Sequence, residues 1–227
     1  MIEIKNVSKT FTLHNQSATS INVMEGANLS VKPGQCVALT GSSGSGKSTL
    51  MRMIYGNYLT QEGEILIDGV DVVQAEPREI IELRKSTLGY VSQFLRVVPR
   101  VSTLNVVAEP LLKIGVDAKT AEERAKELLT RLRIPQNLWQ LSPLTFSGGE
   151  QQRVNIARGF AHEYPAMLLD EPTASLDAKN RETVLALIED AKTRGAAIIG
   201  IFHDEAARDR VCDKQIDVSI FTPKAAA

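Results

Sequence analysis

A glycine- and serine-rich segment at residues 41–48 has the composition and spacing of a phosphate-binding loop. Its sequence, GSSGSGKS, matches the pattern G-x-x-x-x-G-K-[ST] and lies between a short apolar stretch and an apolar pattern with helical spacing. Glycines let backbone N–H groups turn towards phosphate oxygens, and the helix that follows directs its positive end at them. Lys47 is expected to reach the terminal phosphates, and the Ser48 hydroxyl to bind Mg²⁺. We expect nucleotide contacts from Gly41, Ser42, Ser43, Gly44, Ser45, Gly46, Lys47, Ser48 and Thr49.

Two adjacent acidic residues, Asp170 and Glu171, follow the apolar run Met167–Leu169. A buried strand that ends in acids places them at the carboxyl edge of its sheet, beside the phosphate loop. Asp170 suits the binding of Mg²⁺ through its water shell, and Glu171 suits the orientation and deprotonation of an attacking water. A strand that runs into a solvated acidic turn has the same local pattern, and the phosphate loop is what favours the catalytic interpretation.

A second anion site is predicted at the start of another helix. Ser147 is an N-cap candidate with Glu150 three residues later, which is the spacing of a capping box. Between them, Gly148 and Gly149 leave bare N–H groups at the positive end of the helix. One chain does not need two separate phosphate-binding helix ends for one nucleotide. The pattern therefore suggests that another chain supplies half of each site.

The elements around these motifs predict an α/β fold. Short apolar segments, such as 36–39, 88–92, 166–170 and 196–202, alternate with helical patterns, which indicates a mostly parallel sheet covered on both faces. The alternation of Ile2 and Ile4 predicts antiparallel strands at the start of the chain, joined by a polar loop at 14–22. We interpret residues 1–227 as a single domain with a helical subdomain inserted at about 95–146.

Composition and charge exclude several classes of protein. The chain has 227 residues with 26 Lys and Arg against 27 Asp and Glu, so it lacks the basic excess of a nucleic-acid coat. We expect no nucleic-acid partner. No apolar run approaches the roughly 20 residues of a membrane span, and the first residues do not resemble a signal peptide. Cys36 and Cys212 are expected to be reduced core residues of a cytoplasmic protein.

Taken together, these motifs resemble the ATP-binding-cassette (ABC) ATPases over about residues 1–220. GSSGSGKST is similar to the family's Walker A motif, MLLDEP at 167–172 to its Walker B motif, and FSGGEQQR at 146–153 to its signature. Phe146 and Glu150 depart from the usual Leu and Gln of that signature. The resemblance implies the family's P-loop nucleotide-binding fold, with a parallel core, an antiparallel β subdomain and a helical subdomain. It also implies Mg²⁺-dependent hydrolysis of ATP by a head-to-tail dimer, either of two copies or of one copy with a related ABC subunit.

Further site residues come from the resemblance alone. Gln93 matches the glutamine of the Q-loop, with a role in metal binding and catalysis, and His203 matches the switch histidine. Residues 174–177 match the D-loop. Phe11 lies where the family has an aromatic residue that stacks on adenine, although an aromatic at a strand end is also typical of core packing. The nucleotide and its metal would therefore contact Phe11, the phosphate loop, Gln93, Asp170 and the 147–150 helix end.

The cassette motifs do not identify the client, meaning the transporter or enzyme complex that the ATPase serves, and three candidates remain. Residues 85–112 resemble the ATPases of lipoprotein-release and macrolide-export transporters. A DNA-repair or chromosome ATPase ranks last, because Phe146 follows Gln93 by 53 positions, too few for a long coiled-coil arm. The third candidate is the bacterial carbon–phosphorus lyase pathway of phosphonate use. The chain resembles the accessory ABC protein of that pathway in four features: the loop at 14–20, the segments 94–102 and 134–139, and an end soon after 216–221.

The phosphonate interpretation is the one we favour from the sequence. It implies a soluble carbon–phosphorus lyase enzyme complex as the partner. It also implies that the chain is an accessory subunit in the formation of ribose 1-methylphosphonate 5-triphosphate from ATP and methylphosphonate. The alternative is the ATPase subunit of a lipoprotein-release or macrolide-export transporter.

Overall fold

The structure is a computed structural model that describes residues 1–13 and 19–223. A four-stranded antiparallel sheet forms the first layer, in the order β2-β1-β4-β5. Its strands are β1 (Ile2–Leu13), β2 (Thr19–Val31), β4 (Glu62–Ile67) and β5 (Val70–Asp71). The predicted initial strand is confirmed. The loop predicted at 14–22 extends too far along the chain, because β2 begins at Thr19 and pairs with β1. Residues 14–18 of that loop lie outside the described residues.

A five-stranded sheet forms the centre of the molecule, in the order β6-β7-β8-β3-β9 with every neighbouring pair parallel. Its strands are β3 (Cys36–Thr40), β6 (Leu88–Val91), β7 (Ala166–Asp170), β8 (Ala197–Ile201) and β9 (Lys214–Asp217). β7 and β8 are buried at every position, as expected of parallel strands covered on both faces. The predicted parallel α/β core is confirmed.

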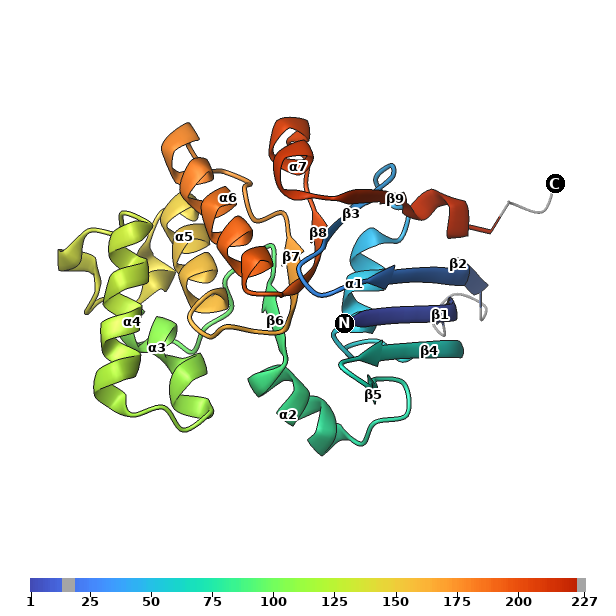
Figure 1. Ribbon diagram of the computed structural model, residues 1–227, viewed down its shortest axis with the longest axis horizontal. Helices are drawn as coiled ribbons and strands as arrows, with labels where there is room; N and C mark the ends of the chain where they lie inside the picture. The colour runs from blue at the N-terminus through green and yellow to red at the C-terminus, as the bar shows by residue number, and fades with distance from the viewer. Residues whose placement is uncertain (14–18, 224–227) are drawn as a thin grey trace.

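Two hydrophobic clusters cover the faces of the parallel sheet. On one face, α1 (Lys47–Ile54) buries Leu50, Met51, Met53 and Ile54 in a cluster that includes residues of both sheets. On the other face, a second cluster contains residues of α5 (Gly148–Gly159) and α6 (Ala178–Thr193). Figure 1 shows the antiparallel sheet on one side of the central strands and these two helices on the other.

The remaining helices lie around these layers. α3 (Thr103–Lys113) and α4 (Ala118–Arg131) pack with α5 on the side of the central strands away from the antiparallel sheet, and the turns Gln136–Leu138 and Pro143–Thr145 lead from α4 to α5. α2 (Pro77–Ser86) precedes β6, and α7 (Glu205–Val211) follows β8. The turn Val218–Phe221 follows β9. No helix among the described residues has the length and apolarity needed to cross a membrane.

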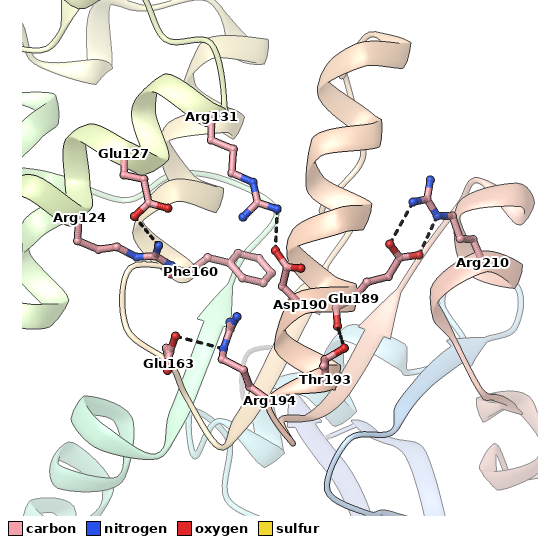
Figure 2. Close-up of polar contacts among 10 residues, drawn as sticks. All are labelled: Arg124, Glu127, Arg131, Phe160, Glu163, Glu189, Asp190, Thr193, Arg194 and Arg210. Carbon is pink, nitrogen blue, oxygen red and sulfur yellow. Dashed lines mark hydrogen bonds and ion pairs between the residues drawn. The ribbon is translucent and has the colours of Figure 1, made fainter.

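Ion pairs connect the outer helices to one another (Figure 2). Arg131 of α4 contacts Asp190 of α6 at 2.7 Å, and Arg210 of α7 contacts Glu189 of α6 at 2.8 Å. Each such exposed pair contributes only about 0–1 kcal/mol to stability. The pairs therefore add little to stability, and the apolar clusters supply most of the free energy of folding.

The approach of β4 to β1 gives a test of the fold at Gly63. Gly63 has a φ of 88°, and a Cβ there would collide with the backbone of Lys5 and Asn6. Gly69 has a φ of 87°, but a Cβ at that position would meet nothing within 4 Å. Gly69→Ala should reduce the free energy of unfolding by about 1–2 kcal/mol through backbone strain alone. Gly63→Ala should cost about 1–3 kcal/mol more, because β1 must move. Equal losses for the two variants in urea unfolding would contradict the close β1–β4 contact.

Candidate functional site

The phosphate loop joins β3 to α1 in a conformation that requires glycine. Gly41, Gly44 and Gly46 have φ values of 128°, 83° and 96°, a region that side chains with a Cβ rarely adopt. At Gly41 space is also short, since a Cβ would lie 2.7 Å from Ser45 Oγ. Gly46 is the N-cap of α1, so Lys47, Ser48 and Thr49 form its first turn, whose N–H groups have no partner within the helix. The loop is thus built to present backbone donors to an anion.

The Lys47 side chain folds back over this loop. Its Nζ donates hydrogen bonds to the carbonyl oxygens of Gly41 at 2.7 Å and Ser42 at 2.9 Å. These carbonyl dipoles hold the ammonium group at the mouth of the loop. A phosphate held by the same loop would offer this ammonium full negative charges, which attract it more strongly than carbonyl dipoles do.

Three residues predicted around the metal line one cavity of about 690 Å³: Ser48 from α1, Gln93 after β6 and Asp170 at the end of β7. Their hydroxyl, amide and carboxylate oxygens are the ligands that Mg²⁺ prefers. Within the described ranges, no group of three or more His, Cys, Asp or Glu residues forms an all-protein metal cage. Mg²⁺ at nucleotides is usually held by one or two carboxylates together with phosphate oxygens and water. The residues present therefore fit Mg²⁺ bound together with a nucleotide.

Asp170 is largely withdrawn from solvent, with 8% of its surface exposed. Burial raises the pKa of this carboxyl above its ordinary value, and a hydrogen bond from the Tyr90 hydroxyl to Oδ2, 3.2 Å long, opposes that rise. Burial also raises the pKa of Tyr90 well above its ordinary value, and the negative charge of Asp170 raises it further. Tyr90 therefore keeps its proton and acts as the donor in this pair.

Glu171 is joined to both other residues predicted to act in the chemical step. Its Oε1 lies 2.7 Å from Nε2 of His203, and its Oε2 accepts a hydrogen bond of 3.3 Å from Nε2 of Gln93. The Glu171 backbone has a φ of 55°, which is unusual for a residue with a side chain, and its N–H donates to the Ile201 carbonyl of β8 at 3.0 Å. The sheet holds Glu171 in this strained turn, and its carboxylate is placed beside the cavity-lining Gln93.

The second predicted anion site lies at the start of α5, outside this cavity. Ser147 caps the helix with the expected capping box, and the Glu150 carboxylate accepts hydrogen bonds from the Ser147 N–H at 3.0 Å and hydroxyl at 2.7 Å. Ser147 thereby lowers the pKa of Glu150. The residues 147–150 do not line the cavity that holds Ser48 and Asp170. Of the phosphate loop, Ser48 alone lines that cavity, so the lining joins the start of α1 to Asp170 and leaves out the capped start of α5.

Phe11 also lies outside the lining of that cavity. Its ring meets the ring of Tyr58 edge to face, with centroids 5.3 Å apart, and Lys9 Nζ lies 4.9 Å from the Phe11 centroid. The ring is half-buried. These neighbours supply the packing role that the sequence left open for Phe11, and stacking on adenine remains a prediction.

The sequence analysis missed residues that fix the Q-loop to α5. Asn155 Nδ2 donates to the Ser92 carbonyl at 2.6 Å, and Arg158 donates to the Arg96 carbonyl at 3.1 Å while pairing with Glu109 at 2.7 Å. Asn155 and Arg158 are three residues apart and so share one face of α5. A polar residue on the buried face of the helix, such as Asn155, was the available signal. Tyr90 gave no such signal, because its strand has the apolar sequence typical of a strand in a protein core.

Comparisons with known proteins agree with this geometry. The family model described as "ABC transporter" matches residues 24–174. The lipoprotein-releasing system ATP-binding protein LolD of Aquifex aeolicus is 37% identical over 182 residues, which cover 80% of this chain and 81% of LolD. The macrolide export ATP-binding/permease protein MacB of Escherichia coli is 33% identical over 95% of this chain, but the chain spans only 34% of MacB.

A solved structure shares the whole fold. The dimeric, post-hydrolysis structure of the ATP-binding cassette MJ0796 bound to ADP and Pi has a TM-score of 0.87 and 29% identity, covering 96% of this chain and 95% of that one. In sequence, MJ0796 of Methanocaldococcus jannaschii is 34% identical over 208 residues, 90% of this chain. The family model covers more than half of the chain, and relatives above 30% identity cover most of it. The chain therefore belongs to the ABC transporter family, of which it is an ATP-binding cassette.

Proposed function

We propose that this ABC ATPase hydrolyses ATP at two composite sites in a head-to-tail dimer. The observation that carries the proposal is the capped start of α5 at Ser147, a second helix end suited to an anion, which contributes nothing to the lining of the cavity that contains Ser48 and Asp170. A second copy in the opposite orientation would bring its own α5 helix end to the nucleotide. The dimeric structures described for MJ0796 support this arrangement.

The side chains around Glu171 suggest how the chemical step proceeds. The Glu171 carboxylate takes a proton from a water whose oxygen attacks the γ-phosphorus. The bond from the γ-phosphorus to the oxygen that bridges to the β-phosphate breaks, and ADP and phosphate leave. His203 and Gln93 contact one Glu171 oxygen each and so orient the base. Mg²⁺, when bound, neutralises charge on the β- and γ-phosphate oxygens.

For the client, we propose a membrane permease of the lipoprotein-release or macrolide-export type as the first candidate. The names of LolD and MacB support it, since both refer to export or release systems. In MacB the ATP-binding and permease parts share one protein, of which this chain matches about a third. The cassette would then act at the cytoplasmic face of the membrane on a permease, whether that permease belongs to the same chain or to another.

The carbon–phosphorus lyase complex is the second candidate. Segment 94–102, one of those that resemble the accessory ABC protein of that pathway, exposes two apolar side chains, Phe94 at 69% and Val98 at 71%. Phe94 also lines the cavity that contains Asp170. A partner that covers this apolar edge would contact the Q-loop directly. The accessory role in forming ribose 1-methylphosphonate 5-triphosphate stays a proposal beside transport on the resemblance of these segments alone.

Removal of the Lys47 ammonium should weaken ATP binding without loss of the fold. Lys47 contacts loop carbonyls rather than the core, so Lys47→Ala should keep the wild-type melting temperature. Its affinity for ATP should fall about 10–100-fold, the equivalent of a charge-assisted hydrogen bond. Lys119→Ala, an exposed lysine of α4, is the matched control and should bind normally. Unchanged ATP affinity in Lys47→Ala, measured by calorimetry, would disprove the phosphate-loop assignment.

Replacement of Glu171 by Gln should separate binding from chemistry. The amide keeps the size of the side chain but cannot accept the proton, so single-turnover hydrolysis should slow by about 10²–10⁴-fold. ATP affinity should stay near the wild-type value, because the lost interaction belongs to the transition state. Glu163→Gln, at an exposed position paired with Arg194, should behave as wild type. Wild-type hydrolysis by Glu171→Gln would move the base to another residue, with His203 the next candidate.

Deletion of the gene distinguishes the two clients. If the phosphonate complex is the client, the deletion strain should not grow on methylphosphonate as sole phosphorus source but should grow on phosphate, and the protein should co-purify with soluble enzymes. If a permease is the client, growth on methylphosphonate should be normal and the protein should co-sediment with membranes. The ATPase predictions above are independent of this result.

A further inference from the structure

The Tyr90 hydroxyl is directed at the predicted magnesium acid by the register of the sheet. Tyr90 of β6 lies opposite Leu168 of β7, and Asp170 is two residues further along β7. Because side chains two apart on a strand share one face, Tyr90 and Asp170 are diagonal neighbours on the same face of the sheet. The hydroxyl donates to Asp170 Oδ2 at 3.2 Å, and both residues line the cavity that also contains Ser48.

The Tyr90 ring is itself held in place. It packs against the ring of Tyr55, with centroids 4.8 Å apart and planes at 50°. Tyr55 is fixed in turn by Arg84, whose guanidinium lies 4.3 Å from the Tyr55 centroid and whose Nε donates to the Tyr55 carbonyl at 2.9 Å. The position of the Tyr90 hydroxyl is therefore set by packing before any nucleotide binds.

The hydrogen bond from Tyr90 makes the two carboxylate oxygens of Asp170 inequivalent. Oδ2 accepts from Tyr90, whereas Oδ1 accepts no hydrogen bond from the part of the chain that the structure describes. A carboxylate free to rotate would present either oxygen at random. With Oδ2 held, Oδ1 is the oxygen left to face the cavity and the water shell of a metal.

We propose that Tyr90 is a positioning residue, which orients the Asp170 carboxylate for Mg²⁺ binding. The proposal rests on the magnesium role assigned to Asp170 in the proposed function. The competing explanation is purely structural: Asp170 would serve only as the hydrogen-bond acceptor of the half-buried Tyr90 hydroxyl. The two accounts differ in what the loss of the hydroxyl does to metal affinity, as opposed to stability.

The test measures metal binding rather than turnover. Mn²⁺, used in place of Mg²⁺, is titrated by electron paramagnetic resonance into the full chain saturated with a non-hydrolysable ATP analogue. Tyr90→Phe removes one oxygen and keeps the ring packing. Partners of metal ligands typically contribute about 10–100-fold to metal affinity, so Mn²⁺ affinity should fall by that factor. Affinity for the analogue without metal, and the melting temperature, should stay near wild type.

Tyr55→Phe is the matched control, because the Tyr55 hydroxyl makes no hydrogen bond to any described residue while its ring packs on Tyr90. It should bind Mn²⁺ as wild type does. Wild-type Mn²⁺ affinity in Tyr90→Phe would overturn the proposal, as would equal losses of metal affinity in both variants. Asp170→Asn separates this failure from that of the proposed function: if it too binds Mn²⁺ normally, the metal role of Asp170 is wrong.

Discussion

The parallel pairing of β6, β7, β8 and β3 brings the predicted site residues together. These neighbouring strands all point the same way, so their carboxyl ends meet at one edge of the sheet. β3 leads into the phosphate loop, β6 into Gln93, β7 into Asp170 and Glu171, and β8 into His203. Residues 47, 93, 170 and 203 are far apart in the chain but are gathered by strand order alone. The contacts of Glu171 with Gln93 and His203 follow from this order.

A second constraint joins α5 to the Q-loop. The same helix that begins with Ser147 reaches back to hold the Q-loop, through the bond from Asn155 to the Ser92 carbonyl. Movement of α5 and its neighbours would therefore act on Gln93 directly.

The sequence predicted the parts of the fold that depend on local pattern. The strand 166–170 and the capping box at Ser147 were both predicted and are confirmed, because an apolar run and cap chemistry determine them locally. The start of β2 at Thr19 was missed, since its polar residues resemble a loop and only pairing with β1 makes them a strand. The hydroxyl of Tyr90 and the amide of Asn155 act across elements, and such contacts have no signature in a single sequence.

Enclosure of each nucleotide by two chains can be measured by sedimentation of the Glu171→Gln chain with ATP. This variant should retain ATP, so a dimer should persist long enough to be measured. The chain that carries both Glu171→Gln and Lys47→Ala should remain a monomer under the same conditions. We expect a dimer that appears only with ATP and only in the single variant. A monomer at saturating ATP in the Glu171→Gln chain would contradict it.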